Sequence, residues 1–201
     1  MKRALLASYE KDDHLLALAG LLTKHGWSLL GSAGTAKFLS SNGYACRDIA
    51  EIVGPPILGH RVVSLARQIY AALLSTPKDE EELLRLGIRP VGLVYVTLYP
   101  LEKTIADKKS TPENVLEKTD IGGPTLLRAA AKGRRLALSS PDQIAELRAC
   151  LETSNRADDK ERLVLKFAAA AERRVAEYVA ASADYWESRL EYPQGGKKRA
   201  R

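Results

Sequence analysis

Short apolar runs alternate with amphipathic stretches along this chain, and that alternation limits its fold more than any other feature. Residues 3–8 form the first apolar run, 12–25 form an amphipathic stretch that ends before a glycine, and 27–31 form the second apolar run. Parallel strands need a crossover between them, usually a helix, so this order of elements indicates a parallel sheet. We therefore predict an α/β fold with a mainly parallel sheet.

Further elements follow from the same signals. Apolar runs at 92–98 and 136–138 predict two more strands, and the pattern over 124–132 predicts a helix. Three more helices are expected to begin at turns in which a serine or threonine precedes a proline, which are Thr76-Pro77, Thr111-Pro112 and Ser140-Pro141.

A long helix is predicted over 158–190, because apolar side chains recur there at spacings of three and four. Its apolar stripe either covers the sheet or meets a second subunit, and both uses are open at this point. We expect one α/β domain over 1–151, a helical extension packing on it over 152–191, and a disordered basic tail over 192–201.

Charge and composition argue against several functional classes. Four of the six excess positive charges lie in 197–201, which leaves +2 for the rest of the chain and argues against a nucleic-acid partner. No apolar run approaches the roughly 20 residues that span a bilayer, and charges come too early for a signal peptide. We therefore expect a cytoplasmic protein with no membrane partner. Cys46 and Cys150 are too far apart for a C-x-x-C knuckle, so we predict reduced core cysteines and no metal site.

A small polar turn follows the second predicted strand. Its residues Ser32, Gly34 and Thr35 lie between a strand end and a helix start, where the helix dipole and free N–H groups attract anions. Small residues let the backbone approach a phosphate, and hydroxyls can donate to its oxygens. The turn is a candidate phosphate site, and an ordinary capped turn is the alternative.

Two further polar stretches lie near predicted strand ends or helix starts. Tyr99 follows the apolar run 92–98 and would present its hydroxyl at the sheet edge, unless it is a plain surface tyrosine. The stretch 120–125 carries Asp120 and two glycines before a helix, and so exposes N–H groups to an anion or an oxyanion, unless it is an ordinary loop. Open α/β sheets bind ligands at the carboxyl ends of their strands, so the three stretches together indicate one site.

Together these stretches resemble the IMP cyclohydrolase domain of the bifunctional enzymes that formylate aminoimidazole carboxamide ribotide and close it to inosine monophosphate. The resemblance runs from about residue 3 to about 151. It is carried by 32–37, 59–62, 98–100 and, above all, 120–132, which nearly matches the family signature. It implies a methylglyoxal-synthase-like three-layer α/β fold without the family's larger transformylase domain. We expect a homodimer that needs no cofactor and binds a phosphorylated imidazole or purine ribonucleotide.

The resemblance implies an enzyme that closes, or in reverse hydrolyses, the six-membered ring of a purine-like ribonucleotide. The carboxamide nitrogen is a poor nucleophile, so closure needs an orienting carboxylate, a proton shuttle and oxyanion donors. By motif position, Lys132 matches the catalytic lysine, Asp120 the carboxylate that holds the carboxamide, and Tyr99 the phenol near the reacting carbonyl. The residues expected to bind substrate are Ser8, Lys11, Ser32, Gly34, Thr35, Arg61, Ser64, Ile121, Gly122, Gly123 and Thr125.

Several positions depart from the family pattern. Val63 replaces a lysine, Ala66 a histidine and Thr97 an asparagine, so the implied pocket has lost a cation. Lys11 matches a family lysine only if the register shifts. Either Lys11 or Arg67 supplies a substitute charge, or the natural substrate presents a less polar group, and we favour the second interpretation. Two other functions stay open: a non-catalytic nucleotide-binding regulatory domain, and a lyase of the methylglyoxal-synthase kind.

Overall fold

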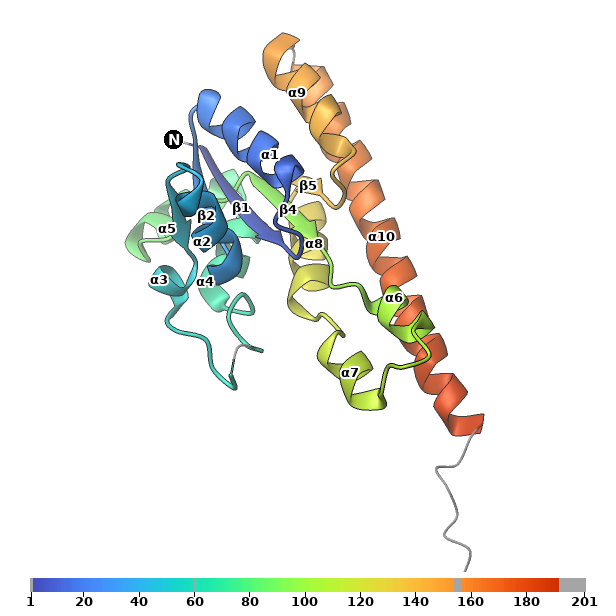
Figure 1. The fold of residues 1–201 in the computed structure, drawn as a ribbon. Coiled ribbons are helices and arrows are strands. Elements are labelled where there is room, and N and C mark those ends of the chain that lie inside the picture. Colours follow the sequence, from blue (N-terminus) through green and yellow to red (C-terminus); the bar gives the residue numbers. More distant parts are fainter. Residues whose placement is uncertain (1, 60, 154–156, 192–201) are drawn as a thin grey trace, which may run out of the picture.

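Five parallel strands form the centre of the molecule (Figure 1). The computed structural model describes residues 2–59, 61–153 and 157–191, so the predicted basic tail lies outside the described residues. The strands are β1 (Lys2–Ser8), β2 (Trp27–Gly31), β3 (Cys46–Asp48), β4 (Leu93–Thr97) and β5 (Leu136–Leu138). Their order across the sheet is β3-β2-β1-β4-β5. The predicted parallel sheet is confirmed.

The helices lie between and around these strands. They are α1 (Asp13–Lys24), α2 (Ala33–Ser41), α3 (Ala50–Val53), α4 (Arg67–Leu74), α5 (Glu80–Arg85), α6 (Leu101–Ala106), α7 (Pro112–Glu117), α8 (Gly122–Lys132), α9 (Gln143–Thr153) and α10 (Ala157–Glu191), with a short 3-10 turn at Pro77–Asp79. The sequence signals do not predict β3, α3, α4 or α6. Each has eight residues or fewer, and periodicity is read over windows of about 11.

Side chains from the two faces of the sheet form two separate cores. Leu5 packs in one cluster with Leu73 of α4 and Leu127 of α8. Its neighbour Leu6 packs in the other cluster with Leu18 of α1 and Leu147 of α9. Successive side chains of a strand point to opposite faces, so helices cover the sheet on both sides. This is the predicted three-layer arrangement.

The long helix α10 packs against the body of the same chain. Its side chains Phe167, Ala171, Val175 and Tyr178 are buried, and the helix contacts α8, α6, α9 and the edge strand β5 (Figure 1). A covered edge strand is protected from pairing with another chain. The predicted helix is confirmed, and its apolar stripe covers the sheet rather than being left free for a second subunit.

Two smaller expectations have mixed outcomes. The turn before α9 is capped as its sequence predicts, because Gln143 Oε1 accepts hydrogen bonds from the N–H groups of Ser139 at 2.7 Å and Ser140 at 3.0 Å. Cys46 and Cys150 are free but only partly buried at the margin of a core cluster, so the prediction of core cysteines was too strong.

Among the residues that the structure describes, no helix carries an apolar stretch long enough to cross a bilayer.

Candidate functional site

The predicted site residues of three strand ends meet at the carboxyl edge of the sheet. Because β1 and β4 are parallel and paired in register, Ser8 at the end of β1 lies beside Thr97 at the end of β4. On the other side of β1, Leu6 pairs with Gly31, so Ser32 follows at the same edge. Its backbone N–H donates to the carbonyl of Leu6 at 3.0 Å. The edge therefore gathers polar side chains that are far apart in sequence.

Four hydroxyls at this edge, those of Ser8, Ser32, Thr35 and Thr97, form what we call the hydroxyl cluster. The Ser8 Oγ and Thr97 Oγ1 atoms lie 2.8 Å apart. Thr35 Oγ1 accepts from the Ser8 N–H at 3.1 Å and from Ser32 Oγ at 3.0 Å. Thr35 is fully buried, so its hydroxyl holds the turn together and is not available to a ligand. The expected direct contact of Thr35 Oγ1 with a phosphate is not supported by this geometry.

The first turn of α2 is nevertheless open to an anion. Ser32 occupies the N-cap position but makes no capping hydrogen bond with its side chain, so the first N–H groups of the helix lack that partner. Gly34 lies in this turn and is exposed. A Cβ on Gly34 would lie 3.6 Å from Lys11 Cε, which places the lysine beside the helix start. The N–H groups, the helix dipole and one cation converge there.

Lys11 reaches this position by folding back over the end of β1. Its Nζ donates to the carbonyl of Ser8 and, at 3.2 Å, to that of Tyr9. Burial lowers the pKa of Lys11, and the nearby carboxylate of Asp12 opposes that shift. The structure thus brings Lys11 to the predicted anion site despite its shifted position in the sequence.

The second half of the site is the Asp120 turn, which we define as residues 120–123, from the loop after α7 into the first turn of α8. Asp120 Oδ1 accepts from the Gly123 N–H at 3.0 Å. Burial raises the pKa of the Asp120 carboxyl, and the N–H groups of Gly123 and Gly122 partly offset that effect. Within the described residues Asp120 forms no ion pair, so a half-buried carboxylate faces the site without a cation.

Helix α10 holds the Asp120 turn from behind. The hydroxyl of Tyr178 accepts from the Asp120 N–H at 2.8 Å and donates to the carbonyl of Lys118 at 2.9 Å. Tyr178 is fully buried, and burial raises the pKa of its phenol to about 12. The long helix therefore positions the turn as well as covering the sheet.

Glycine is required in this turn because other atoms approach it closely. A Cβ on Gly123 would overlap Asp120 Oδ2 and would lie 2.7 Å from Leu98 Cδ2. A Cβ on Gly122 would lie 2.8 Å from Ser64 Oγ, so Ser64 belongs with the Asp120 turn rather than with the hydroxyl cluster. The Gly123 N–H already binds Asp120, so its predicted role as an oxyanion donor is not supported in this state.

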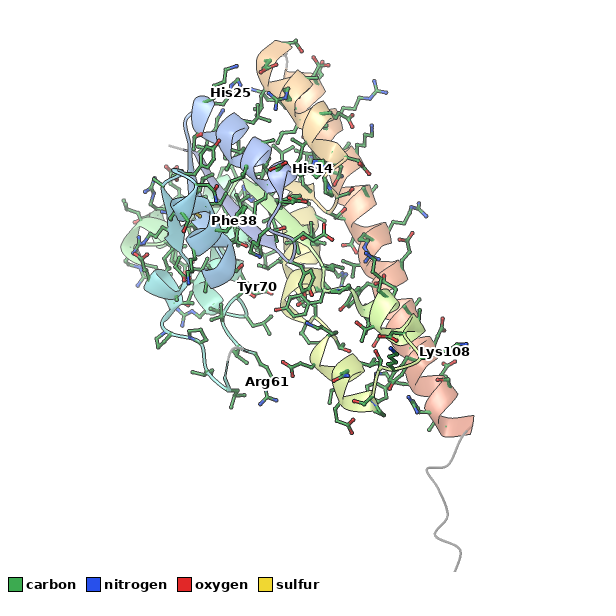
Figure 2. The ribbon with its side chains drawn as sticks, in the orientation of Figure 1. His14, His25, Phe38, Arg61, Tyr70 and Lys108 are labelled. Atoms are coloured by element: carbon green, nitrogen blue, oxygen red, sulfur yellow. The ribbon has the colours of Figure 1, made fainter. Side chains whose placement is uncertain are left out.

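The start of α8 is fixed by a hydroxyl pair. Tyr70 of α4 donates to Thr125 Oγ1 at 2.8 Å, and that hydroxyl in turn lies 2.8 Å from the carbonyl of Ile121. Figure 2 labels Tyr70, which comes from the helix beside α8. Thr125 thus makes its contacts within the protein, while the side chain of Ile121 is largely exposed.

Two tyrosines and a lysine form an aromatic and cation–π group beside the Asp120 turn. The sequence analysis predicts Tyr99 as a site residue but misses Tyr9 and Lys118. The rings of Tyr9 and Tyr99 are 5.1 Å apart at an angle of 57°. Lys118 Nζ lies 5.4 Å from the centre of the Tyr9 ring and 5.6 Å from that of Tyr99. Burial and then the charge of Asp120 raise the pKa of Tyr99, so its phenol stays protonated near neutral pH. The positions of Tyr9, directly after β1, and Lys118, two residues before Asp120, were the available signals.

Two predicted site residues join neither the hydroxyl cluster nor the Asp120 turn. Arg61 is exposed in the loop between α3 and α4, where its Nε donates to the carbonyl of Leu58 at 3.1 Å and the side chain points away from the sheet (Figure 2). Lys132 ends α8, whose 11 residues separate it from Gly122 by about 15 Å. Because α8 begins at the site, Lys132 lies towards the opposite edge of the sheet. The geometry does not support either motif-based role.

The altered positions serve the packing of the protein. Val63 and Ala66 are half-buried against the core cluster of α4 and α8, and Thr97 joins the hydroxyl cluster. The apolar residues at 63 and 66 thus have apolar neighbours. In the part of the chain that the structure describes, no three His, Cys, Asp or Glu side chains gather in a way that could hold a metal ion.

Comparison with known proteins identifies relatives. The family model of the MGS-like domain matches residues 14–125. The bifunctional purine biosynthesis protein PurH of Cyanothece sp. is 40% identical over 155 residues, which cover 72% of this chain and 30% of the relative. PurH of Oenococcus oeni is 36% identical over 200 residues, 96% of this chain and 38% of the relative. This chain therefore spans about a third of the length of these relatives.

A solved structure gives the same picture for the whole fold. The crystal structure of ForH superposes with a TM-score of 0.78 at 29% sequence identity. The match covers 92% of this chain and 98% of that chain. The similarity thus extends beyond residue 125 and includes most of the elements described above.

Proposed function

The chain belongs to the MGS-like domain family, and from this premise we propose that it is a cyclohydrolase-type enzyme acting on a purine-like ribonucleotide. The proposed reaction closes, or in reverse hydrolyses, a six-membered ring, as in the conversion of formamido-imidazole carboxamide ribotide to inosine monophosphate. One observation carries the proposal: the open helix start beside Lys11 and the unpaired carboxylate of Asp120 lie at the same edge of one parallel sheet.

We assign the phosphate of the substrate to the first turn of α2. The uncapped N–H groups of that turn and the positive end of the helix dipole attract an anion. Lys11 adds a charge whose ammonium, among the described residues, is bound to backbone carbonyls, and a phosphate would be a stronger acceptor. Thr35 acts here by holding the turn in shape.

We assign the reacting ring to the Asp120 turn. In closure, the carboxamide nitrogen bonds to the formyl carbon and gives up one proton, and the π electrons of that carbonyl move to its oxygen. That oxygen leaves as water with this proton and the formamido N–H proton, and a C=N bond forms between the former formyl carbon and the formamido nitrogen. Asp120 can accept a hydrogen bond from the carboxamide N–H and so orient the poor nucleophile. Tyr99, protonated near neutral pH, can donate to the formyl oxygen as its charge builds.

The proposal is tested by following ultraviolet absorbance when the purified protein is mixed with formamido-imidazole carboxamide ribotide, because ring closure changes the chromophore. We expect turnover, and we expect purine 5′-monophosphates to raise the melting temperature while the corresponding nucleosides do not. Equal shifts from nucleotide and nucleoside would remove the phosphate assignment.

A non-catalytic nucleotide-binding domain is the second candidate, and two observations favour it. Lys132 is far from the Asp120 turn, and Val63 packs against the core where the resembling family has a lysine. Nucleotide-dependent stabilisation without any change in absorbance would support this candidate over the enzyme.

Tyr99→Phe is expected to slow ring closure by about 10- to 100-fold, the effect of losing one hydrogen bond to a charged group. The variant keeps the ring that packs on Tyr9, so its melting temperature should stay close to that of the parent. Tyr44→Phe removes a phenol outside the site, beside Gly20 of α1, and serves as the matched control with a normal rate. Equal rates for Tyr99→Phe and the parent would exclude the phenol from the reaction.

A further inference from the structure

We propose a second ligand site, for a small organic phosphate, in a cavity of about 360 Å³ on the α4 face of the sheet. Three arginines line it: Arg3, Arg47 and Arg89. Arg3 and Ser8 are five residues apart on β1, so Arg3 lies about 16 Å from the end of the strand at which Ser8 joins the hydroxyl cluster. None of the residues that line the cavity belongs to the hydroxyl cluster or to the Asp120 turn, so it is distinct from the proposed active site.

The sheet itself brings two of the arginines to one face. Side chains alternate along a strand, so Arg3 shares the face of Leu5, which packs towards α4. Leu30 packs on the same side, and its register partner in β3 is Arg47. Arg89 reaches the cavity from the segment between α5 and β4. The three cations thus come from separate parts of the chain, so the cluster is a product of the fold and not of a local basic run.

The charges of this cluster are not balanced within the protein. Arg47 pairs with Glu51, its Nε lying 2.9 Å from Oε2. Arg3 and Arg89 have no ion pair or side-chain hydrogen bond with any described residue, and no acidic residue lines the cavity in that part of the chain. Burial lowers the pKa of Arg3, and the charges of Arg89 and Arg47 lower it further. The half-buried Arg3 is thus held beside the like charges of the exposed Arg47 and Arg89, and a bound anion would relieve that repulsion.

The other residues that line the cavity indicate which organic group the bound phosphate carries. Most of them are apolar and come from α3, α4 and the segment before β4: Ile52, Ile69, Ala72, Leu86, Ile88 and Val91. Gln68 adds an amide that can both donate and accept hydrogen bonds. The volume lies in the range of small-molecule pockets, which are mostly apolar with a few placed polar groups. Arginine forks suit phosphate oxygens, and the apolar walls suit a flat organic body. A nucleoside monophosphate has both parts.

The test is a titration with AMP followed by two-dimensional NMR of the arginine Nε–H groups, assigned by substitution. We expect AMP to move the resonances of Arg3, Arg47 and Arg89, none of which belongs to the proposed active site. In the double variant Arg3→Gln/Arg89→Gln, the affinity reported by Arg47 should fall by about 100-fold or more, since each guanidinium makes charge-assisted bonds. Arg85→Gln, which removes an exposed charge of α5 outside the cavity, is the matched control and should bind within twofold of the parent.

Four results make the test decisive. If AMP moves none of the three resonances, or if the double variant binds as the parent does, the site does not exist as proposed. At low salt the melting temperature of Arg3→Gln should not fall below that of the parent, because the substitution removes like-charge repulsion. An unchanged melting temperature would show that weaker AMP binding does not result from loss of the folded state. Ring closure should be unchanged in the arginine variants, and the rise in melting temperature with purine 5′-monophosphates that remains in the double variant reports the first turn of α2 alone. This inference and the proposed function can therefore fail independently.

Discussion

Asp120→Asn is expected to reduce the rate of ring closure by about 10²- to 10⁴-fold, the usual contribution of one positioned acid–base or orienting group. The carboxylate lies half-buried with no cation in the described part of the chain, so it is free to accept from the carboxamide of the substrate. The neutral amide has the same shape, keeps an oxygen for the Gly123 N–H, and accepts more weakly. The measurement is the absorbance change under single-turnover conditions.

The same variant should show that the ionised Asp120 carboxylate lowers the stability of the folded protein. Burial raises the pKa of the Asp120 carboxyl above its unfolded value of about 4. Folded protein then holds this proton more tightly than unfolded protein does, so the contribution of Asp120 to stability is largest below pH 4 and is lost as the pH rises through the folded pKa. The melting temperature of Asp120→Asn relative to the parent should therefore increase between pH 4 and pH 7. A difference that stays constant over this range would contradict the assigned pKa shift.

Lys132→Ala, measured in the same assay, tests whether the position of this lysine in the motif or its position in the structure decides its role. The motif assigns Lys132 a catalytic role, but α8 separates it from the Asp120 turn by about 15 Å. On the geometry we expect a rate within a few fold of the parent. Loss of activity in a folded Lys132→Ala protein would restore the motif-based assignment and would require a different position for this lysine during the reaction.

Gly133→Ala is expected to lower the free energy of unfolding by about 3 kcal/mol, at the upper end of the usual cost of overpacking. Gly133 follows α8, and a Cβ there would overlap the carbonyl oxygen of Leu73 and lie 2.9 Å from its carbonyl carbon. These are backbone atoms of α4, held in place because Arg135 donates to the same carbonyl at 2.8 Å and to that of Ser75 at 2.5 Å. The clash can be relieved only by moving one helix against the other.

Chemical denaturation measures this effect, and Gly34→Ala is its control. Gly34 lies in the first turn of α2, and its added Cβ would meet only Lys11 Cε at 3.6 Å, an ordinary contact. Alanine favours a helix over glycine, so Gly34→Ala should be as stable as the parent or slightly more stable. If both variants unfolded at the parent's denaturant concentration, the close contact between α4 and α8 would not exist in solution.

Helix α10 not only covers the sheet but also fixes the position of the Asp120 turn. The buried phenol of Tyr178 is hydrogen-bonded to both ends of the segment from Lys118 to Asp120, so the helix ties the Asp120 turn to the rest of the core. Arg174, one turn earlier, pairs with Glu102 of α6 at 2.6 Å. The orientation of Asp120 thus rests on a helix that begins more than thirty residues later in the chain.

Residue patterns alone determined the class of fold and most of its long elements. Alternating apolar runs and capped helices are local signals, so β1, β2, α1, α9 and α10 could be predicted from neighbouring residues. The polar turns at 32–35 and 120–125 could also be recognised as candidate sites, because small residues before a helix start expose N–H groups whatever the rest of the fold does.

Tertiary structure decided which residues of those turns can meet a ligand. Thr35 Oγ1 is buried between the backbone N–H of Ser8 and the hydroxyl of Ser32. The side chain of Arg61 points away from the sheet and Lys132 lies at the far end of α8, whereas Tyr9 and Lys118 join the site. The three arginines of the second cavity likewise come from positions 3, 47 and 89. Such outcomes depend on strand register and helix length, which place residues far apart in sequence side by side and can separate residues of one motif. A local pattern identifies a chemical group, but the packing of the whole chain sets its direction and its neighbours.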